Sequence, residues 1–469
     1  MMKNWLNYDR YAVYGLGRSG RSAARLLANR GKHVVASDAA LPEDLDAEVD
    51  ELPDEVDVVT GGNDPADAEV CIVSPGLRPN LDCLEDLRRR GIPIVPEIEL
   101  AAEACRAPII GITGTDGKTT TTSMCGTIAR ASRRDSVVGG NIGTPLSEVV
   151  DEVDSEGLVV AEISAFQLWS THHFCPSIAA FTNVAGDHLD YFDQWDQYVE
   201  AKRRLIAFSQ RDDTAVFNAE DDTVWSWTDG FPGTSIAYGL YRPGESAGDG
   251  VRLWREGREL VADGPDFPDG TRTLVDLDDV AFRGDHNHLD ALCAAGAALG
   301  AGLCVDSIRR GLEAFEPLGH RIEDLGCIDG VRFINDSKAT NVHAALAGLR
   351  SLGGDFIAIV GGVDKGLDLD PLAHFVAERA AGVVVIGELR NRLDEALRAA
   401  GLADERVTRV DSLEEATHVA FDKARELEES QPTVILSPAS SSFDMFDSYE
   451  HRGEVFREVV GQLNLKISG

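Results

Sequence analysis

Residues 108–120 read Pro-Ile-Ile-Gly-Ile-Thr-Gly-Thr-Asp-Gly-Lys-Thr-Thr, and this stretch decides the fold of the chain. An apolar run that favours a strand leads into two glycines, a lysine and a threonine, and a threonine-rich helix start follows. Glycines let backbone N–H groups approach phosphates, and the N-terminus of a helix adds a favourable dipole. A Gly-Lys-Thr tripeptide alone arises by chance in loops, but the strand–loop–helix order around it predicts an ATP site.

The residue types in this loop suggest separate roles. We expect Lys118 to reach the β- and γ-phosphates and the Thr119 hydroxyl to ligate Mg²⁺. The spacing is Gly-x-x-Gly-Lys-Thr, which is shorter between the glycines than in the general NTPase pattern. The predicted ATP-binding residues of the loop are Gly114, Thr115, Asp116, Gly117, Lys118, Thr119 and Thr120.

A second glycine-rich turn lies near the start of the chain. A strand at residues 11–14 precedes Gly-Leu-Gly-Arg-Ser-Gly, a helix follows over 21–30, and a strand from residue 33 ends at Asp38. A Gly-x-Gly-x-x-Gly turn with an acidic residue about 20 positions later is typical of dinucleotide sites. This pattern leaves open an NAD-binding oxidoreductase, but we favour a Rossmann-like fold that holds another nucleotide or none.

The whole chain alternates strands with helices, which predicts an α/β fold with mainly parallel, doubly wound sheets. Its 469 residues suit about three domains, which we place at 1–105, 106–317 and 318–469. The first and third are predicted to be Rossmann-like and the second to be the ATP-binding domain. Further strands are expected at 136–139, 158–163, 178–183, 250–254, 273–277, 356–360, 383–386 and 433–436, and further helices at 194–208, 289–299, 371–379, 389–400 and 413–428.

The charge of the chain excludes several kinds of partner. A formal net charge of −36 repels nucleic acid and anionic membranes, so we expect neither as a partner. Only 8 lysines accompany 36 arginines, and acid enrichment with lysine depletion indicates a halophilic source. Where lysine is disfavoured, a retained lysine is more often needed for its chemistry. Lysines stand in four site-like segments, at Lys118, Lys202, Lys338 and Lys365.

Other sequence features suit a cytoplasmic protein. The chain has no apolar run of 18 residues, and its first residues lack the apolar core of a signal peptide. Its 8 cysteines include no Cys-x-x-Cys pair, which argues against a zinc site or a disulfide framework. We expect reduced thiols and a monomer.

Two polar residues at strand ends are candidate metal ligands. Glu162 ends an apolar strand, and His188 follows another strand a few residues later. With the hydroxyl of Thr119 they could hold Mg²⁺ bridged to nucleotide phosphates. A lone histidine is more often a hydrogen-bonded loop residue, but the strand-end location that His188 shares with Glu162 favours a site. Lys202 is expected on the helix at 194–208, where a solvated lysine would be the default.

Taken together, these motifs resemble the Mur ligase family across all three blocks, in order. The segments that carry the resemblance are Gly-Thr-Asp-Gly-Lys-Thr-Thr (114–120), Gly-Asn-Ile-Gly (140–143), Glu-Ile-Ser (162–164), Asn183 with Asp-His-Leu-Asp (187–190), Tyr-Val-Glu-Ala-Lys (198–202), Gly-Asp-His-Asn (284–287), His-Arg-Ile-Glu (320–323), Asn-Asp-Ser-Lys-Ala-Thr-Asn (335–341), Gly-Gly-Val-Asp-Lys-Gly (361–366) and Ser-Pro-Ala-Ser-Ser-Ser-Phe-Asp-Met-Phe (437–446) with Arg-Gly (452–453).

The resemblance implies an ATP-dependent amide ligase of peptidoglycan synthesis. The last motifs point to members that add D-glutamate to UDP-N-acetylmuramoyl-L-alanine. A substrate carboxylate is phosphorylated to an acyl phosphate, which the amine of D-glutamate then attacks. A further relative could instead join glutamate to another nucleotide-activated or polyglutamate acceptor.

The resemblance also implies roles for individual residues. The catalytic residues would be Lys118, Asn141, His188 and Lys202, and Mg²⁺ would be served by Thr119, Glu162, His188 and Lys202, with Lys202 carrying a CO₂-derived carbamate. ATP would be contacted by Asn287, Arg321 and Asp336, and D-glutamate would be held by Lys338, Thr340, Lys365, Ser442 and Phe443. The UDP-sugar would be held by Gly15, Leu16, Gly17, Arg18, Ser19, Asp38, Ser74, Pro75 and Gly76.

Five positions depart from the family pattern. Asp116 and Asp290 stand where asparagine is usual, which places carboxylates near the nucleotide. Asp38 is followed by two alanines rather than a Thr-Arg pair, and Tyr449 replaces a common phenylalanine. These changes lie at the edges of the expected substrates, so they bear on recognition more than on the reacting centre.

Overall fold

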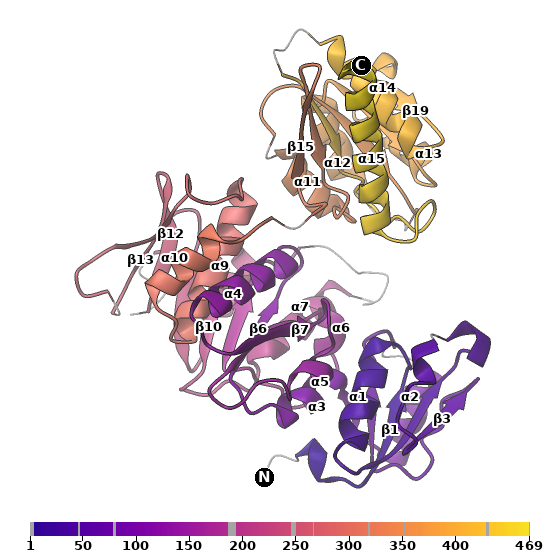
Figure 1. The fold of residues 1–469 in the computed structure, drawn as a ribbon, viewed down its shortest axis with the longest axis vertical. Coiled ribbons are helices and arrows are strands. Elements are labelled where there is room, and N and C mark those ends of the chain that lie inside the picture. The colour runs from indigo at the N-terminus through magenta and orange to yellow at the C-terminus, as the bar shows by residue number, and fades with distance from the viewer. Residues whose placement is uncertain are drawn as a thin grey trace. The chain divides into compact units, whose positions relative to one another are not determined.

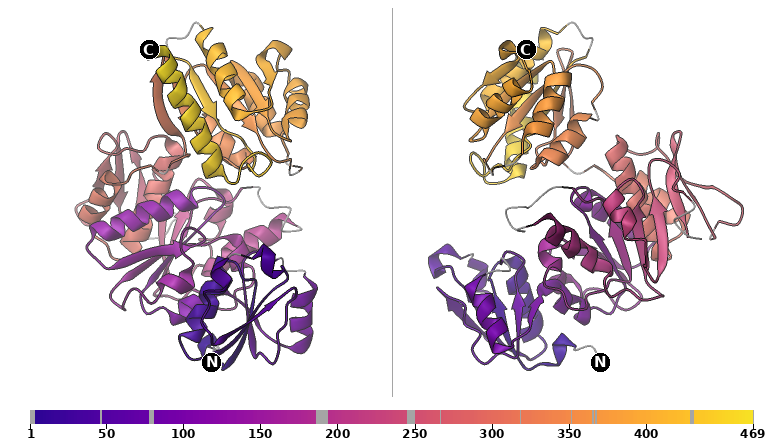
Figure 2. Two further views of the ribbon diagram at one scale, coloured as in Figure 1. Left: turned by 45° about the vertical axis from the view of Figure 1, so that its right-hand side comes forward. Right: turned by 180° about the vertical axis from the view of Figure 1, so that it is seen from behind.

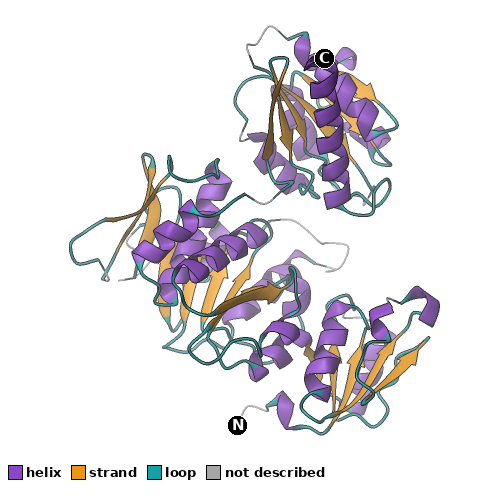
Figure 3. Ribbon diagram, viewed as in Figure 1, coloured by secondary structure: helices purple, strands orange, loops and turns teal. Residues whose placement is uncertain are grey.

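The computed structural model describes residues 4–45, 47–77, 81–185, 194–244, 250–265, 267–317, 319–350, 352–364, 366, 368–427 and 431–468. Three separate sheets with helices beside them confirm the predicted α/β class (Figure 1; Figure 3). Two compact units divide the chain, Met1–Phe315 and Glu316–Gly469. The first unit holds two of the sheets and the second unit holds one.

The first sheet is wholly parallel, with the strand order β3-β2-β1-β4-β5. The glycine turn follows the carboxyl end of the central strand β1, so it lies at the carboxyl edge of the sheet, where nucleotides bind in such sheets. Its elements are η1 (Trp5–Asn7), β1 (Arg10–Tyr14), α1 (Arg18–Ala28), β2 (His33–Asp38), η2 (Pro42–Asp44), η3 (Ala47–Val49), β3 (Val56–Thr60), β4 (Val70–Val73), α2 (Asp82–Arg90), β5 (Ile94–Pro96) and α3 (Glu97–Ala104).

The second sheet has the order β14-β13-β12-β11-β10-β9-β6-β8-β7, and β6 pairs in parallel with β8 and β9. Only its β12–β13 and β13–β14 pairs are antiparallel. Its elements are β6 (Ile109–Thr113), α4 (Lys118–Ala131), β7 (Ser136–Gly140), α5 (Leu146–Val149), β8 (Leu158–Glu162), α6 (Ala165–Leu168), β9 (Ile178–Phe181), α7 (Trp195–Arg203), η4 (Arg204–Ile206), β10 (Thr214–Asn218), α8 (Asp222–Ser226), β11 (Thr234–Tyr238), β12 (Arg252–Glu256), β13 (Glu259–Asp263), β14 (Arg272–Asp276), α9 (Asp285–Gly300) and α10 (Val305–Glu313).

Helices α4, α9 and α10 pack together on this sheet (Figure 1). Small residues allow the close approach: a Cβ on Gly311 of α10 would lie 2.4 Å from the backbone of Ile128 on α4. The strand β6 is buried along its whole length, as its unbroken apolar sequence predicts for a central parallel strand. The sheet therefore gives the phosphate loop a rigid base.

The third sheet, in the second unit, has the order β15-β16-β20-β17-β18-β19. All its pairs are parallel except β15 with β16. Its elements are β15 (Glu323–Ile328), β16 (Val331–Asn335), α11 (Val342–Arg350), β17 (Phe356–Gly361), α12 (Asp370–Arg379), β18 (Gly382–Ile386), α13 (Arg390–Ala399), η6 (Asp404–Arg406), β19 (Val407–Arg409), α14 (Leu413–Arg425), β20 (Thr433–Leu436) and α15 (Tyr449–Ser468).

Two apolar cores flank this third sheet. Residues of α11, α12 and α13 form one core and residues of α14 and α15 form the other. Figure 2 shows the sheet enclosed between these helices from two sides. Strands buried on both faces explain why β17, β18 and β20 read as continuous apolar runs.

Most expected elements are present, with shifted ends. The helix α9 begins four residues before the expected start at 289, because its first turn is polar and carries no apolar periodicity. The helix α7 ends at Arg203 and continues as the short 3-10 turn η4 instead of running to 208. The strand β9 stops at Phe181 rather than 183, because the next two side chains leave the sheet to hold the phosphate loop.

Candidate active site

The phosphate loop joins β6 to α4, and its two glycines are sterically required. Gly114 has φ +156° and Gly117 has φ +78°. A Cβ on Gly114 would lie 1.7 Å from Oγ1 of Thr182, and a Cβ on Gly117 would lie 2.1 Å from Oδ1 of Asp290. Gly117 stands at the N-cap of α4 and has no side chain to cap the helix. The loop therefore offers an anion its backbone and the start of a helix.

Two residues after β9 fix the shape of this loop. The backbone N–H of Thr115 donates to the carbonyl oxygen of Asn183 (2.9 Å), and that of Asp116 donates to Oδ1 of Asn183 (2.9 Å). Oγ1 of Thr182 donates to the carbonyl oxygen of Asp116 (2.6 Å). Neither Thr182 nor Asn183 was predicted as a site residue, although polar residues directly after a buried strand were the available signal.

Two lysine ammonium groups meet on the same loop. Nζ of Lys118 donates to the carbonyl oxygens of Gly114 (2.9 Å) and Thr115 (2.6 Å). Nζ of Lys202 donates to the carbonyl oxygen of Gly114 at 2.5 Å and lies 4.4 Å from the ring centroid of Tyr198. Lys202 is only 1% exposed, so it is a buried residue and not the solvated lysine that its helix alone would suggest.

Glu162 lies at the end of β8 beside the loop. Its backbone is in register with Ile112 of β6, and its side chain is 1% exposed. Nδ2 of Asn141 donates to Oε1 of Glu162 (2.8 Å), and the backbone N–H of Asn141 donates to the carbonyl oxygen of Glu162 (2.8 Å). Oε2 is buried and has no hydrogen-bond partner among the described residues. A buried carboxylate oxygen left in this state fits a divalent cation.

The other predicted metal ligands are only partly placed. Thr119 lies in the first turn of α4, at the phosphate loop. His188 lies outside the described residues. Within the described ranges, no group of three or more His, Cys, Asp or Glu side chains forms a metal cage.

The residues expected on the base side of ATP come from both units. On α9 in the first unit, Nδ2 of Asn287 donates to the carbonyl oxygen of Arg283 (2.8 Å). Asp290, one turn further along, is buried, and its Oδ1 accepts from Oγ1 of Thr121 (3.3 Å). In the second unit, Asp336 follows β16 and Oγ of Ser437 donates to its Oδ2 (2.9 Å). Arg321 precedes β15 and is half-buried.

Four of the residues expected to bind D-glutamate are described, and all four lie in the second unit. Nζ of Lys338 lies 3.7 Å from the ring centroid of Tyr449, and the backbone N–H of Thr340 donates to the carbonyl oxygen of Lys338 (2.7 Å). Ser442 is buried, whereas Phe443 is 74% exposed. Lys365 lies outside the described residues.

Arg452 is a buried residue of this region for which the sequence predicted no role. Its guanidinium donates to Oγ and the carbonyl oxygen of Ser337 (3.0 and 2.8 Å) and to the carbonyl oxygen of Ser440 (3.1 Å). Burial lowers its pKa to about 10. Arg452 therefore ties the loop after β16 to the loop after β20.

The amino-terminal turn brings several predicted UDP-sugar residues together. Gly15 has φ +90°, and a Cβ there would lie 2.8 Å from Cβ of Ser74. Asp38 accepts from the backbone N–H of Leu16 (2.7 Å) through Oδ2 and from that of Ala40 (2.9 Å) through Oδ1. Gly17 caps α1, whose first turn contains Arg18 and Ser19, and Pro75 and Gly76 follow Ser74 in the loop after β4.

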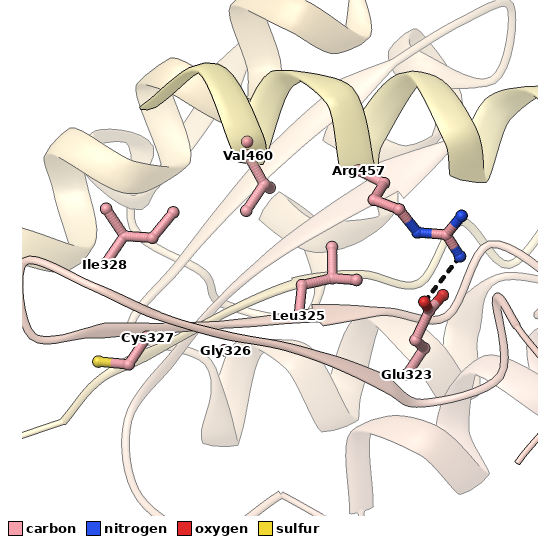
Figure 4. Close-up of a pocket in the computed structure, with 8 residues that line it drawn as sticks. Glu323, Leu325, Gly326, Cys327, Ile328, Arg457 and Val460 are labelled. Carbon is pink, nitrogen blue, oxygen red and sulfur yellow. Dashed lines mark hydrogen bonds and ion pairs between the residues drawn. The ribbon is translucent and has the colours of Figure 1, made fainter. Parts of the chain in front are cut away.

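A surface cavity of about 530 Å³ lies elsewhere, between β15 and α15 (Figure 4). Glu323 and Arg457 form an ion pair at its rim (2.7 Å), and Leu325 and Val460 line it. Its described lining residues include none of the predicted site residues.

No helix in the described part of the chain is both long and apolar enough to cross a membrane.

Comparison with protein families gives three matches in chain order. Residues 9–96 match the Mur ligase MurD-like N-terminal domain, residues 112–298 match the Mur ligase middle domain, and residues 320–439 match the Mur ligase glutamate ligase domain. Relatives named UDP-N-acetylmuramoylalanine–D-glutamate ligase are similar over nearly their full length. The relative from Symbiobacterium thermophilum is 37% identical (97% of this chain, 98% of the relative), and that from Salinibacter ruber is 36% identical (97% and 98%).

Solved structures share the fold at low sequence identity. A pseudomurein peptide ligase type C from Methanothermus fervidus has a TM-score of 0.59 at 19% identity, covering 97% of this chain and 100% of that one. A MurF ligase from Thermotoga maritima in complex with ADP has a TM-score of 0.57 at 17% identity, covering 98% and 100%. These neighbours support the three-domain α/β architecture.

Proposed function

This chain belongs to the Mur ligase family, and we propose on that basis that it joins D-glutamate to UDP-N-acetylmuramoyl-L-alanine in peptidoglycan synthesis, converting ATP to ADP and phosphate. The observation that carries the proposal is the meeting of Lys118, Lys202 and Glu162 at one phosphate loop in a chain whose full-length relatives bear this enzyme name.

The residues at the loop suit transfer of a phosphoryl group to a carboxylate. A free carboxylate is a poor acyl donor, so phosphorylation gives it a leaving group. Catalysis then consists mainly of positioning and of neutralising charge. We assign Lys118 to the transferring phosphoryl group, which requires its ammonium to exchange loop carbonyls for phosphate oxygens. Asn141 keeps Glu162 oriented beside it.

Mg²⁺ would be held by Glu162 and Thr119, and when bound it would neutralise phosphate charge. The unpartnered Oε2 of Glu162, among the described residues, supports this assignment. His188 is proposed for a second metal. Lys202 is proposed to react with CO₂, which would convert its amine into an anionic oxygen ligand. The chain keeps lysine at this position although Arg203 and Arg204 follow it, which supports a need for an amine.

The remaining substrate assignments follow the three sheets. We propose that the loops after β1, β2 and β4 bind the UDP-sugar, that Asn287, Arg321 and Asp336 bind the base and ribose of ATP, and that Lys338, Thr340, Lys365, Ser442 and Phe443 bind D-glutamate. Domain boundaries at residues 105 and 317 would separate these functions. The eight cysteines are all free thiols, which suits the proposed cytoplasmic location.

The alternative of an NAD-binding oxidoreductase is not supported, because the glycine-rich turn lies in the part matching a Mur ligase N-terminal domain. A relative that uses a different glutamate acceptor remains the second candidate. The two alanines after Asp38, where the family has Thr-Arg, are the observation that favours it.

Phosphate release tests the proposal directly. The assay contains ATP, Mg²⁺, bicarbonate and high KCl, with UDP-N-acetylmuramoyl-L-alanine and either D-glutamate or L-glutamate. We expect turnover only when the UDP substrate and D-glutamate are both present. Turnover with another acceptor would preserve the ligase chemistry and replace the proposed pathway, and no turnover with any pairing would refute the proposal.

A further inference from the structure

Glu97, the first residue of α3, makes a buried contact that has no role in the reaction proposed above. Its side chain is 1% exposed, and its Oε1 accepts from the backbone N–H of Ser147 at 2.6 Å. Burial raises the pKa of Glu97, although hydrogen bonds from Ser147 lower it in part. In either protonation state an oxygen remains to accept the N–H of Ser147. The contact links α3, the helix that follows the first sheet, to α5.

Ser147 is the second residue of α5, which follows a tight turn that starts at Gly140, the register partner of Glu162 on β8. The backbone N–H of Gly140 donates to the carbonyl oxygen of Thr144 (2.8 Å), which closes the turn. A Cβ on Gly140 would lie 2.3 Å from the carbonyl oxygen of Glu162, so the turn presses against the end of β8. Within the turn, Asn141 contacts Glu162 through both its backbone and its side chain. The segment 140–147, which consists of this turn and the start of α5, is thus held by Glu162 near one end and by Glu97 at the other.

The other side of Glu97 leads to the proposed UDP-sugar loop. Pro96, directly before Glu97, is the register partner of Val73 at the end of β4. Ser74, the first residue of the loop proposed to bind the UDP-sugar, follows Val73, and its backbone N–H donates to the carbonyl oxygen of Tyr14 (2.9 Å). A displacement of this loop therefore reaches Glu97 through one pair of hydrogen-bonded strands.

We propose that Glu97 is a positioning residue that couples occupancy of the UDP-sugar loop to the orientation of Glu162 at the Mg²⁺ site. The proposal rests on the proposed function. Its physical basis is a continuous path of contacts. The path runs from Ser74 through the β4–β5 pair to Glu97, and then through the segment 140–147 to Glu162, whose Oε2 is unpartnered among the described residues. Asn141 hydrogen-bonds Glu162 directly, and groups that orient a metal ligand in this way typically change metal affinity by about 10- to 100-fold when removed. Glu97 acts one step further back, through the segment that carries Asn141, so its effect should be smaller.

Two variants at one position test the contact. Glu97→Leu keeps the volume but offers no acceptor oxygen, whereas Glu97→Gln keeps an acceptor for Ser147. Glu99→Leu is the matched control, because Glu99 is an equally buried carboxylate of α3 that accepts instead from the backbone of His172 and His173 (both 2.7 Å). Melting temperatures establish that each variant is folded, and Glu97→Ala replaces Glu97→Leu if the latter is not.

The first readout is the Mg²⁺ concentration giving half-maximal turnover. We expect Glu97→Leu to raise this concentration by about 3- to 30-fold, and Glu97→Gln and Glu99→Leu to stay within about 2-fold of the parent. The second readout is the affinity for ADP with Mg²⁺, measured by calorimetry with and without UDP-N-acetylmuramoyl-L-alanine. In the parent protein, the ratio of the ADP affinities with and without the UDP substrate should differ from one, and Glu97→Leu should bring this ratio towards one.

An unchanged Mg²⁺ requirement in a folded Glu97→Leu variant would overturn the proposal, as would an equal shift in Glu99→Leu. A parent protein whose nucleotide affinity does not respond to the UDP substrate would also overturn it. Turnover of the parent with D-glutamate tests the proposed function separately, so the two failures are distinguishable.

Discussion

Nζ of Lys202 lies 2.5 Å from the carbonyl oxygen of Gly114, although 88 residues separate them in the chain. The helix α7 therefore delivers a buried amine to the first residue of the phosphate loop. Tyr198, one turn earlier, reinforces this placement, because its ring lies under Nζ and its hydroxyl lies 3.0 Å from Oγ1 of Thr115. The proposed conversion of this amine to an oxygen ligand would therefore take place beside the phosphate loop.

Replacing Lys202 with arginine tests this conversion. Arginine keeps the positive charge and can still donate to Gly114, but its guanidinium stays protonated and does not form a carbamate. We expect Lys202→Arg to lower kcat by roughly 100-fold or more, since a metal ligand is lost. Turnover of the parent should rise with added bicarbonate and that of the variant should not. Arg203→Lys, at the exposed neighbouring position, should leave both quantities unchanged; a fully active Lys202→Arg would exclude the carbamate.

Replacing Glu162 with glutamine tests the Mg²⁺ assignment. The amide oxygen can still accept from Nδ2 of Asn141, so the local structure should persist, but the negative charge is lost. We expect kcat/KM for ATP to fall by roughly 100-fold, with a higher Mg²⁺ requirement. Turnover measured across a Mg²⁺ titration checks this. Equal Mg²⁺ dependence of variant and parent would show that Glu162 does not serve the metal.

The fold and the centre of the site could be predicted because their signals are local in sequence. The loop around Lys118 follows a run of apolar residues, and Glu162 ends another such run. Parallel strands bring their carboxyl ends to one edge, so strand ends alone predicted that these two residues meet. The family resemblance supplied the roles of residues far from this loop.

The supporting contacts could not be predicted, because they depend on where a chain leaves its sheet. Polar residues mark the end of the apolar run, but the run does not show that β9 stops at Phe181, two residues before the expected end, and frees Thr182 for the loop. The sequence analysis assigned no role to Glu97, because its burial against Ser147 depends on a segment 50 residues away. Such contacts require the packing of distant elements.

Acid should destabilise the protein through His288. Burial, with a further contribution from Arg255, lowers the pKa of His288 to about 4. A histidine with a folded-state pKa below its unfolded value of 6.5 favours folding while neutral, so this stability is lost as pH falls from about 6.5 towards 4. The free energy of unfolding, measured with denaturant, should fall between pH 7 and pH 5 by about 1–2 kcal/mol more in the parent than in His288→Gln. An equal pH dependence in both would assign the acid sensitivity to other groups.

The carboxylate of Asp116 should weaken ATP binding in a salt-dependent manner. Its backbone N–H is fixed by Asn183, which keeps the residue in the phosphate loop whatever its side chain. Removing the charge with Asp116→Asn removes repulsion of the polyphosphate, so we expect KM for ATP to fall by roughly 3- to 10-fold at about 0.1 M salt. At about 1 M KCl the Debye length shortens to roughly 3 Å, and the difference should shrink to less than about 2-fold. Steady-state kinetics at both salt concentrations measure this, with Asp135→Asn, beyond the end of α4, as a control of equal charge change. A variant whose KM advantage is equal at both salt concentrations would show that the carboxylate acts through local hydrogen bonding instead of through its charge.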